Sequence, residues 1–280
     1  MDRNTAKDLD KFYTKKIIAQ QCFDLLKAYA EKYIQNPVFI EPSAGSGSFL
    51  FDGVIGFDLY PEDPRIIKND FINDDFSQYI LGIDNIVFLG NPPFGKKGLL
   101  STQFINKAFQ YSNFVGFILP IQYNKWSGQT QIIPNAKLVM NIILPENSFE
   151  FLGNDYNVRC CFQIWTTYDV LEPNLRIQTK PPTSHPDFEL FQYNRTQQSE
   201  KYFDLDWDFA VIRQGFHNYN DLKFNKEDCN RKYQWIFFKA KSPEVLDKLK
   251  SIDFNKLSKL NTSIPGFGKA DVIAEYTKNK

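Results

Sequence analysis

The clearest helical pattern near the start of the chain follows Phe12-Tyr13-Thr14. Apolar or aromatic side chains then recur at helical spacing, at Ile18, Cys22, Leu25, Tyr29 and Tyr33. This spacing places them on one face of a helix, and threonine is a residue type that caps helix N-termini. Asn36-Pro37 ends the pattern, because proline lacks the N–H group that a helix needs. We therefore expect an amphipathic helix that begins at Thr14.

Short apolar runs dominate the next part of the chain. They cover residues 38–40, 54–57, 66–71, 86–90, 115–119, 138–144 and 157–165. A helical stripe lies between Leu99 and Phe109, and residues 122–134 form a polar stretch that predicts a loop. Strands that alternate with helices in this way indicate an α/β fold with a mostly parallel, helix-covered sheet.

The clearest boundary is Lys180-Pro181-Pro182-Thr183-Ser184-His185-Pro186, where prolines and small polar residues interrupt every periodic pattern. Beyond it the chain is rich in aromatic residues, with a short strand at 235–238 and a helix that opens at Ser242-Pro243. We therefore predict a first domain over 1–178 and a smaller C-terminal region over 187–280.

Composition narrows the classes of function. Of the 280 residues, 42% are hydrophobic and 24% charged, as in a packed globule. Lys+Arg and Asp+Glu both number 33, so the formal net charge is zero. A protein that binds nucleic acid only through its phosphates carries a more positive net charge. Contact with a nucleic acid would therefore use a local basic patch. The 27 Phe and 14 Tyr residues are compatible with stacking surfaces, although most aromatic rings are expected in the core.

The cysteines and the hydropathy pattern indicate in which compartment the protein is expected. The four cysteines, at 22, 160, 161 and 229, include no C-x-x-C pair, so we expect neither a metal site nor a disulfide framework. The first residues lack the apolar stretch of a secretory signal, and no apolar run approaches the length of a membrane span. We expect a soluble, cytoplasmic protein.

A glycine-rich turn follows the strand at 38–40. It reads Glu41-Pro42-Ser43-Ala44-Gly45-Ser46-Gly47-Ser48-Phe49. Small residues let a backbone turn tightly and approach a ligand. The turn lacks the Gly-Lys-Ser/Thr of a Walker A loop, which disfavours an NTPase, and it lacks the full G-x-G-x-x-G fingerprint. A plain strand–turn connection is the alternative.

Carboxylates end the two following strands. Asp58 directly follows 54–57, the position at which nucleotide-binding α/β folds bind ribose hydroxyls. Only 49–53 remains for the intervening helix, about one turn, which is shorter than usual. Asp70 could accept a hydrogen bond from an adenine amino group, with Phe71 against the ring. In the alternative interpretation Asp70 only caps a loop.

The stretch Asn91-Pro92-Pro93-Phe94 follows the apolar run 86–90. Two prolines offer carbonyls but no N–H groups, and the residue before a proline is held extended. The Asn91 amide oxygen and the Pro92 carbonyl therefore form an acceptor corner beside the ring of Phe94. Such a corner suits an aromatic amine, whose two N–H groups find acceptors while its ring is stacked. The tetrapeptide alone is equally typical of an ordinary turn.

Three stretches in this order, Phe-Tyr-Thr at 12–14, Glu-Pro-Ser-Ala-Gly-Ser-Gly at 41–47 and Asn-Pro-Pro-Phe at 91–94, resemble the motifs of the amino-group methyltransferases. These enzymes use S-adenosylmethionine, give S-adenosylhomocysteine, and methylate adenine in DNA or RNA. The order resembles the gamma arrangement, and the likeness covers roughly the first 165 residues. It implies a Rossmann-like sheet with helices on both faces, followed by a small α+β target-recognition appendage.

The resemblance implies roles at matching positions. Phe12, Tyr13 and Thr14 would flank the methionine end of the cofactor, and Glu41 with the turn after it would hold the amino-acid portion. Asp58 would take the ribose hydroxyls, while Asp70 and Phe71 would hold the adenine. The full cofactor set implied is Phe12, Tyr13, Thr14, Glu41, Pro42, Ala44, Gly45, Gly47, Asp58, Leu59, Asp70, Phe71 and Asn91.

The resemblance also implies the catalytic set Asn91, Pro92, Pro93 and Phe94, with Phe94 stacking on the target base. Tyr156 lies where the family has its second base-stacking aromatic, with Phe149 in reserve. Candidates for phosphate contacts are Lys96, Lys97, Lys125, Lys201, Arg213, Arg231 and Lys232. Each of these is equally typical of a solvated surface.

The predicted function is therefore transfer of a methyl group to the N6 amino group of adenine, with DNA favoured over RNA as the partner. Two other substrates stay open: an RNA adenine, and a glutamine amide in a protein, which an Asn-Pro-Pro-Tyr motif serves. A non-catalytic nucleic-acid-binding subunit is the alternative from a different class.

Overall fold

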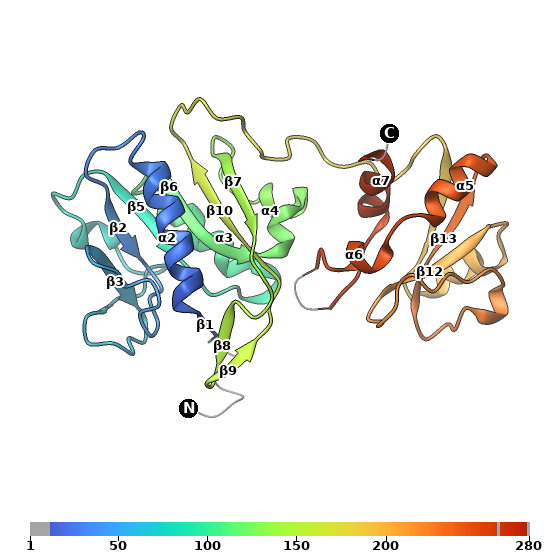
Figure 1. The fold of residues 1–280 in the computed structure, drawn as a ribbon, viewed down its shortest axis with the longest axis horizontal. Helices are drawn as coiled ribbons and strands as arrows, with labels where there is room; N and C mark the ends of the chain where they lie inside the picture. Colours follow the sequence, from blue (N-terminus) through green and yellow to red (C-terminus); the bar gives the residue numbers. More distant parts are fainter. Residues whose placement is uncertain (1–11, 262–263, 279–280) are drawn as a thin grey trace. The chain divides into compact units, whose positions relative to one another are not determined.

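The structure, a computed structural model, describes residues 12–261 and 264–278 (Figure 1). The chain divides into two compact units, the first ending at Gln178 and the second beginning at Thr179. In the first unit the strands are β1 (Tyr13–Thr14), β2 (Val38–Glu41), β3 (Val54–Asp58), β4 (Ile67–Lys68), β5 (Ile86–Gly90), β6 (Phe114–Pro120), β7 (Lys137–Ile143), β8 (Phe149–Phe151), β9 (Asn154–Tyr156) and β10 (Cys160–Thr166). Its helices are α2 (Lys16–Ala30), α3 (Leu99–Ala108), α4 (Trp126–Gln129) and the 3-10 helices η1 (Phe76–Tyr79), η2 (Lys96–Gly98) and η3 (Ile121–Asn124).

The first unit is built around a seven-stranded sheet. Its strand order is β4-β3-β2-β5-β6-β10-β7. Neighbouring strands from β4 to β6 are parallel, and β10 runs antiparallel to both β6 and β7. The predicted α/β fold with a mostly parallel sheet is confirmed.

Helices cover both faces of this sheet. Along β5, which is buried throughout, Val87 and Leu89 pack into a core with residues of α2. The alternate side chains Ile86 and Phe88 pack into a second core with residues of α3. Figure 1 shows α2 and α3 on opposite sides of the sheet. A strand buried on both faces is apolar at every position, which is why its sequence reads as a continuous hydrophobic run.

The start of the first helix differs from the prediction. The helix α2 begins at Lys16, its N-cap is Lys15, and no side chain caps it. Thr14 instead lies in β1, where it pairs with Phe149, and Tyr13 pairs with Glu150. The Lys15 N–H donates to the Ser148 carbonyl at 3.0 Å and extends this pairing. Strand pairing with a distant segment has therefore displaced the local capping interaction.

Three other local predictions were also inexact. Between β2 and β3 the described backbone forms turns and no helical turn. The strand predicted over 66–71 is reduced to β4, whose two residues are exposed. The stretch 122–134, predicted as a loop, contains most of η3 and all of α4. Short segments of this kind take their conformation from the elements on either side rather than from their own periodicity.

A small sheet joins distant parts of the first unit. Its strand order is β1-β8-β9, and all its pairs are antiparallel. In this register Phe149 pairs with both Thr14 and Tyr156. The N-terminal strand and the hairpin that carries Tyr156 are thus one structural element.

The second unit has its own three-stranded antiparallel sheet, in the order β11-β13-β12. Its elements are β11 (Phe188–Tyr193), η4 (Gln197–Asp204), β12 (Phe209–Gln214), η5 (Lys226–Asp228), β13 (Gln234–Ala240), α5 (Pro243–Lys250), α6 (Phe254–Ser258) and α7 (Lys269–Lys278). Ser242 caps α5 as its sequence predicts. One face of the sheet packs with α5, α6 and α7, and the other packs with η4. The predicted small α+β appendage is confirmed as a fold.

Candidate active site

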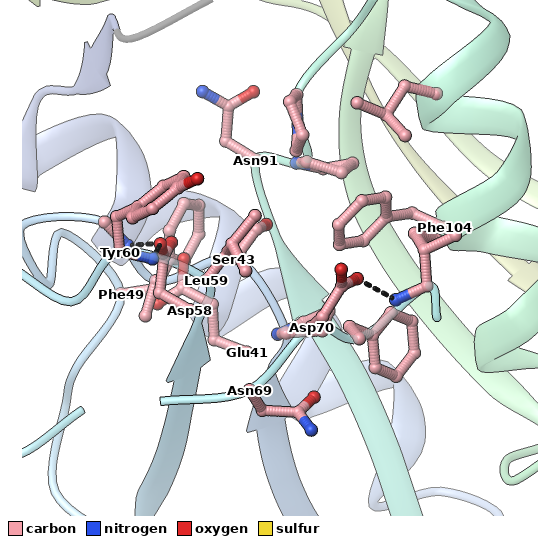
Figure 2. A pocket seen from close by; sticks show the side chains of 18 of the residues that line it. Glu41, Ser43, Phe49, Asp58, Leu59, Tyr60, Asn69, Asp70, Asn91 and Phe104 are labelled. Atoms are coloured by element: carbon pink, nitrogen blue, oxygen red, sulfur yellow. Dashed lines mark hydrogen bonds between the residues drawn. The ribbon is translucent and has the colours of Figure 1, made fainter. Parts of the chain in front are cut away.

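A cavity of about 530 Å³ lies at the carboxyl ends of the parallel strands of the first unit. Glu41 and Asp58 are the last residues of β2 and β3, and Asn91 directly follows β5. Figure 2 shows the side chains of 18 of the residues that line it, with Glu41, Asp58 and Asn91 among those labelled. This edge is where open α/β sheets bind ligands, and the volume lies within the range of small-molecule sites. The lining residues are Phe12, Tyr13, Thr14, Glu41, Pro42, Ser43, Ala44, Gly45, Ser48, Phe49, Asp58, Leu59, Tyr60, Asn69, Asp70, Phe71, Ile72, Asn73, Asn91, Pro92, Pro93, Gly95, Leu100, Gln103 and Phe104.

The small sheet brings β1 to the glycine turn. The Tyr13 hydroxyl donates to the Glu62 carboxylate at 2.8 Å, and its ring lies where a side chain on Gly45 would be, 3.1 Å from an added Cβ. Burial and this hydrogen bond raise the pKa of Tyr13 above its ordinary value, so the ring stays neutral. Gly45 has φ +53°, a conformation that glycine adopts without strain. A glycine is therefore required here both for the turn and for the approach of Tyr13.

Asp58 holds the glycine turn in place. Its carboxylate accepts the Gly45 N–H at 2.8 Å and the Tyr60 N–H at 2.7 Å (Figure 2). A carboxylate has about four lone-pair positions, so two acceptor positions are left for a ligand in the cavity. Gly47 is not among the residues that line the cavity. Its φ is +87°, and a Cβ added there would lie 2.9 Å from the Leu50 side chain, so the turn requires glycine at this position.

Glu41 is the most deeply buried carboxylate of the site, at 2% exposure. Burial, with a smaller contribution from Asp58, raises its pKa well above the ordinary value. A side chain on Gly90 would lie 3.0 Å from the Glu41 Cγ, and Gly90 has φ +138°. The end of β5 can therefore pass beside Glu41 only because residue 90 has no side chain.

Asp70 acts as the cap of the loop that follows β4. Its Oδ1 accepts the N–H groups of Ile72 and Asn73, and its Oδ2 accepts the Asn73 side-chain amide at 2.8 Å. These bonds, the Asn73 side chain foremost, lower the pKa of Asp70. Phe71 is 2% exposed and packs among core rings. The predicted capping alternative is thus present, and both residues also line the cavity.

Some oxygen atoms of the Asn-Pro-Pro-Phe corner accept hydrogen bonds from the protein and others do not. The Pro93 carbonyl accepts the Ser101 hydroxyl at 3.3 Å, and the Phe94 carbonyl accepts the Leu100 N–H at 3.2 Å. Within the described part of the chain, neither the Asn91 amide oxygen nor the Pro92 carbonyl accepts a hydrogen bond. The first turn of α3 therefore fixes the end of the corner, while Asn91 and Pro92 line the cavity.

Buried polar atoms that lack a partner gather at this cavity. Across residues 12–261 and 264–278, the buried side-chain oxygens and nitrogens without a hydrogen bond belong to Thr14, Glu41, Ser43, Asn69 and Asn91. Every one of these residues lines the cavity. An unpaired buried polar atom costs about 1–3 kcal/mol, so native structures tolerate it mainly where a ligand or water supplies the partner. These atoms are acceptors or hydroxyls, which fits a ligand that carries several donors.

The predicted base-stacking aromatics lie beside the cavity rather than in its wall. Phe94 is 6% exposed, and its ring centroid is 5.2 Å from that of Phe12. Phe12 also lies 5.2 Å from Phe149 and 5.7 Å from Tyr156. The corner and the β8–β9 hairpin thus meet in one aromatic cluster, which Phe12 connects to the cavity.

The candidate phosphate-binding residues are dispersed. Lys96 is exposed at the start of η2, and the side chain of Lys97 is outside the described part of the structure. In the second unit Arg213 is structural: its guanidinium donates to the Phe267 carbonyl and the Asn194 side chain, and burial lowers its pKa. Arg231 lies over the Phe203 ring. These arginines are therefore held by the protein itself.

Several lining residues were missed by the sequence reasoning. Ser43 and Asn69 adjoin predicted residues, and their small polar side chains provided a signal that was not used. Tyr60 follows Asp58 and Leu59 at the edge of the cavity, where it is 54% exposed. Gln103 and Phe104 of α3 also line the cavity. Phe104 belongs to the helical stripe that the hydrophobic pattern assigns to the core, and Gln103 is outside that stripe.

Neither a metal cluster nor a membrane span is found in the described residues. No group of three or more His, Cys, Asp or Glu side chains among them is arranged to hold a metal ion. None of the helices in that part of the chain is both long and apolar enough to cross a bilayer.

Comparison with known proteins bears on the fold. No protein-family model and no curated protein matches the chain. Among solved structures it is similar to the type IIL restriction-modification enzyme MmeI in complex with DNA, with 10% identity and a TM-score of 0.57 over 98% of this chain and 69% of that chain. The two chains share a fold. The predicted Rossmann-like sheet with helices on both faces is confirmed.

Two further solved structures match more weakly. The M protein of the type I restriction enzyme EcoKI is 11% identical, with a TM-score of 0.43 over 96% of this chain and 70% of that one. A protein from Pyrococcus horikoshii, proposed to be an RNA methyltransferase, is 14% identical, with a TM-score of 0.39 over 53% and 82% of the two chains.

Proposed function

We propose that this protein is an S-adenosylmethionine-dependent methyltransferase that acts on the N6 amino group of adenine in DNA. The observation that carries the proposal is the convergence of the glycine turn and the Asn-Pro-Pro-Phe corner on one cavity, where the unpaired buried polar atoms also gather. Had the two motifs lain on opposite sides of the sheet, no group could pass between them. Their common cavity also favours an enzyme over a subunit that has kept only the fold.

The residues present fit S-adenosylmethionine. Glu41, with its unpaired Oε2, and the hydroxyl of Thr14 suit the amino-acid portion of the cofactor, whose ammonium group is a donor. Asp58 has acceptor capacity for ribose hydroxyls, and the loop at Asp70 and Phe71 offers a carboxylate beside an apolar wall for the adenine. When bound, the cofactor supplies an electrophilic methyl group on a sulfonium sulfur.

The acceptor corner would activate the target amine. The lone pair of an aromatic amine is delocalised into its ring, so the nitrogen is a poor nucleophile. Hydrogen bonds from its two N–H groups to the Asn91 amide oxygen and the Pro92 carbonyl localise charge on the nitrogen and orient its lone pair. Rate enhancement then comes from positioning and electrostatics. After the methyl group is transferred the nitrogen is cationic, and one of its N–H protons then leaves to water, so the corner needs no strong base.

A base in a duplex must leave the stack to reach this corner, which costs a few kcal/mol. Stacking on Phe94 and Tyr156 would offset that cost, since each aromatic contact contributes about 1–3 kcal/mol. Because Phe94 is 6% exposed, its aromatic cluster must open to admit a base. The exposed Lys96 and the adjacent Lys97 in the sequence are the nearest candidates for holding the flanking phosphates. The second unit, which follows the catalytic one in the gamma order, is the proposed target-recognition region.

The test is a labelled methyl-transfer assay on DNA, RNA and cell protein with the wild type, Asn91→Ala and Asn135→Ala. Asn135 is an exposed asparagine before β7 and serves as the matched control. Asn91→Ala is expected to lower turnover by at least about 100-fold, the scale for loss of one positioned group at a reacting centre. Its affinity for S-adenosylhomocysteine should stay within a few-fold of the wild type. Near-normal turnover of Asn91→Ala would refute the role of the corner.

The substrate arms of the same assay separate the alternatives. Label in DNA that digests to N6-methyl-2′-deoxyadenosine supports the proposal. Label in RNA or in protein glutamine would show that one of these is the substrate instead, and cofactor binding without transfer would point to a non-catalytic subunit. Absence of cofactor binding by calorimetry would overturn the proposal as a whole.

A further inference from the structure

The loop that follows β4, residues 69–74, is called the nucleoside loop here, and hydrogen bonds within it restrict its conformation. Asn69, Asp70, Phe71, Ile72 and Asn73 all line the cavity. The Asp70 carboxylate caps the inside of the loop, as described above. At its far end the Asp74 carboxylate accepts the Asp70 N–H at 3.0 Å and the Asn69 side-chain amide at 3.1 Å. These bonds fix the loop's own shape. The Asn69 N–H also donates to the Asp58 carbonyl at 2.9 Å, and the Phe71 ring packs against Phe104 of α3, with 5.4 Å between the ring centroids.

Lys107, in the last turn of α3, adds hydrogen bonds between the loop and that helix. Its ammonium donates to the Ile72 carbonyl at 2.8 Å and to the Asp74 carbonyl at 2.7 Å. It also lies over the Phe71 ring, 5.8 Å from the centroid. Charge-assisted hydrogen bonds to two carbonyls are stronger than neutral ones. A single half-buried cation thus attaches three residues of the loop to one helix.

The other end of the same helix holds the acceptor corner. The Leu100 N–H donates to the Phe94 carbonyl, and the Ser101 hydroxyl donates to the Pro93 carbonyl, both in the first turn of α3. The ten-residue helix α3 is about 15 Å long. The helix therefore connects the acceptor corner at its start with the nucleoside loop at its end.

We propose that Lys107 is a positioning residue that sets the nucleoside loop at the distance from the acceptor corner that S-adenosylmethionine requires. The inference rests on the proposed function and deepens it, because it assigns the nucleoside half of the cofactor to a loop that this lysine joins to α3 by hydrogen bonds. Lys107 itself does not line the cavity and acts through the carbonyls of Ile72 and Asp74.

The experiment compares Lys107→Met, Lys107→Arg and the control Lys68→Met, an exposed lysine on β4 next to the same loop. Calorimetry measures binding of S-adenosylhomocysteine and of 5′-methylthioadenosine, which keeps the nucleoside but lacks the amino-acid portion. Lys107→Met should weaken both ligands about tenfold, which corresponds to about 1.4 kcal/mol. Lys107→Arg, which can still donate to two carbonyls, should restore most of the affinity. In turnover assays the KM for S-adenosylmethionine should rise while kcat at saturation stays unchanged.

The outcomes separate this inference from the proposed function. Unchanged binding of both ligands to Lys107→Met would overturn the inference, with Lys107→Arg and thermal unfolding showing that the variants are folded. Loss of S-adenosylhomocysteine binding with intact 5′-methylthioadenosine binding would also overturn it, because the effect would then lie at the amino-acid portion. A fall in kcat at saturation would place the effect at the corner instead. Failure of the wild type to bind either ligand would overturn the proposed function itself.

Discussion

Substitution of Gly90 by alanine tests whether β5 passes Glu41 as closely as the structure shows. Gly90 is the last residue of β5 and precedes the acceptor corner, and its φ of +138° is one that other residues rarely adopt. An added Cβ would lie 3.0 Å from the Glu41 Cγ and 3.1 Å from its Oε1. Alanine at this position therefore meets both a strained backbone and a buried carboxylate.

The expected loss in the free energy of unfolding of Gly90→Ala follows from these two effects. Backbone strain of this kind costs about 1–3 kcal/mol. Crowding in a packed interior adds about 1–3 kcal/mol. The free energy of unfolding of Gly90→Ala should therefore fall by roughly 2–6 kcal/mol. Gly82→Ala is the matched control, because Gly82 has φ +76° but an added Cβ there meets no atom within 4 Å. It should lose only about 1–2 kcal/mol, the cost of the left-handed conformation.

Urea unfolding of the single variants and of Gly90→Ala/Glu41→Ala isolates the contact. Alanine at position 41 removes the crowded Cγ, so the cost of Gly90→Ala should fall by about 1–3 kcal/mol in that background. Calorimetry with S-adenosylhomocysteine should show weaker binding to Gly90→Ala than to Gly82→Ala, since Glu41 must move. Equal stability of the two glycine variants, no coupling in the double variant and wild-type cofactor affinity would together refute the packing of β5 against Glu41.

Three other expectations follow from the same structure. Burial raises the pKa of Glu41 above its ordinary 4.5, so the folded state holds this proton more tightly, and the stability it provides is lost as pH rises. The free energy of unfolding of Glu41→Gln should therefore exceed that of the wild type at pH 8 and equal it near pH 4. An equal difference between the two proteins at both pH values would contradict this. Phe149→Ala empties a fully buried position and should cost about 3–5 kcal/mol in urea unfolding, against less than about 0.5 kcal/mol for the half-exposed Leu152→Ala. Tyr156→Ala should weaken binding of a target oligonucleotide by about 1–3 kcal/mol in a titration while S-adenosylhomocysteine binding holds, and parallel losses would argue against base stacking.

Much of the fold could be predicted because its signals are local. A strand covered on both faces, such as β5, must be apolar at every position, and a helix on a sheet must be apolar at every third or fourth position. Proline at the start of α5 fixes its own backbone, and the Ser242 side chain accepts the N–H of Val245 three residues later, so the N-terminus of this helix was also predictable. These constraints can be recognised in a single sequence without knowledge of any contact partner.

The candidate site was predictable in part for a related reason. Glu41, Asp58 and Asn91 each end or follow a parallel strand, and the ends of parallel strands meet at one edge of the sheet. Order along the chain was therefore enough to bring them together. Gly47 was assigned to the ligand from its place in the turn, and this stays a prediction, since Gly47 is not among the residues that line the cavity.

What the sequence alone determined, then, is the alternation of strands and helices, the strand-end carboxylates and the stiffness of the double-proline corner. Only the tertiary structure decided that Thr14 pairs in a strand with Phe149 instead of capping a helix, and that Lys107 reaches back to the loop at Ile72. The reason is physical. Propensity and periodicity act within a few residues, whereas pairing and buried hydrogen bonds join residues far apart in the chain, and their partners exist only once the sheet has formed.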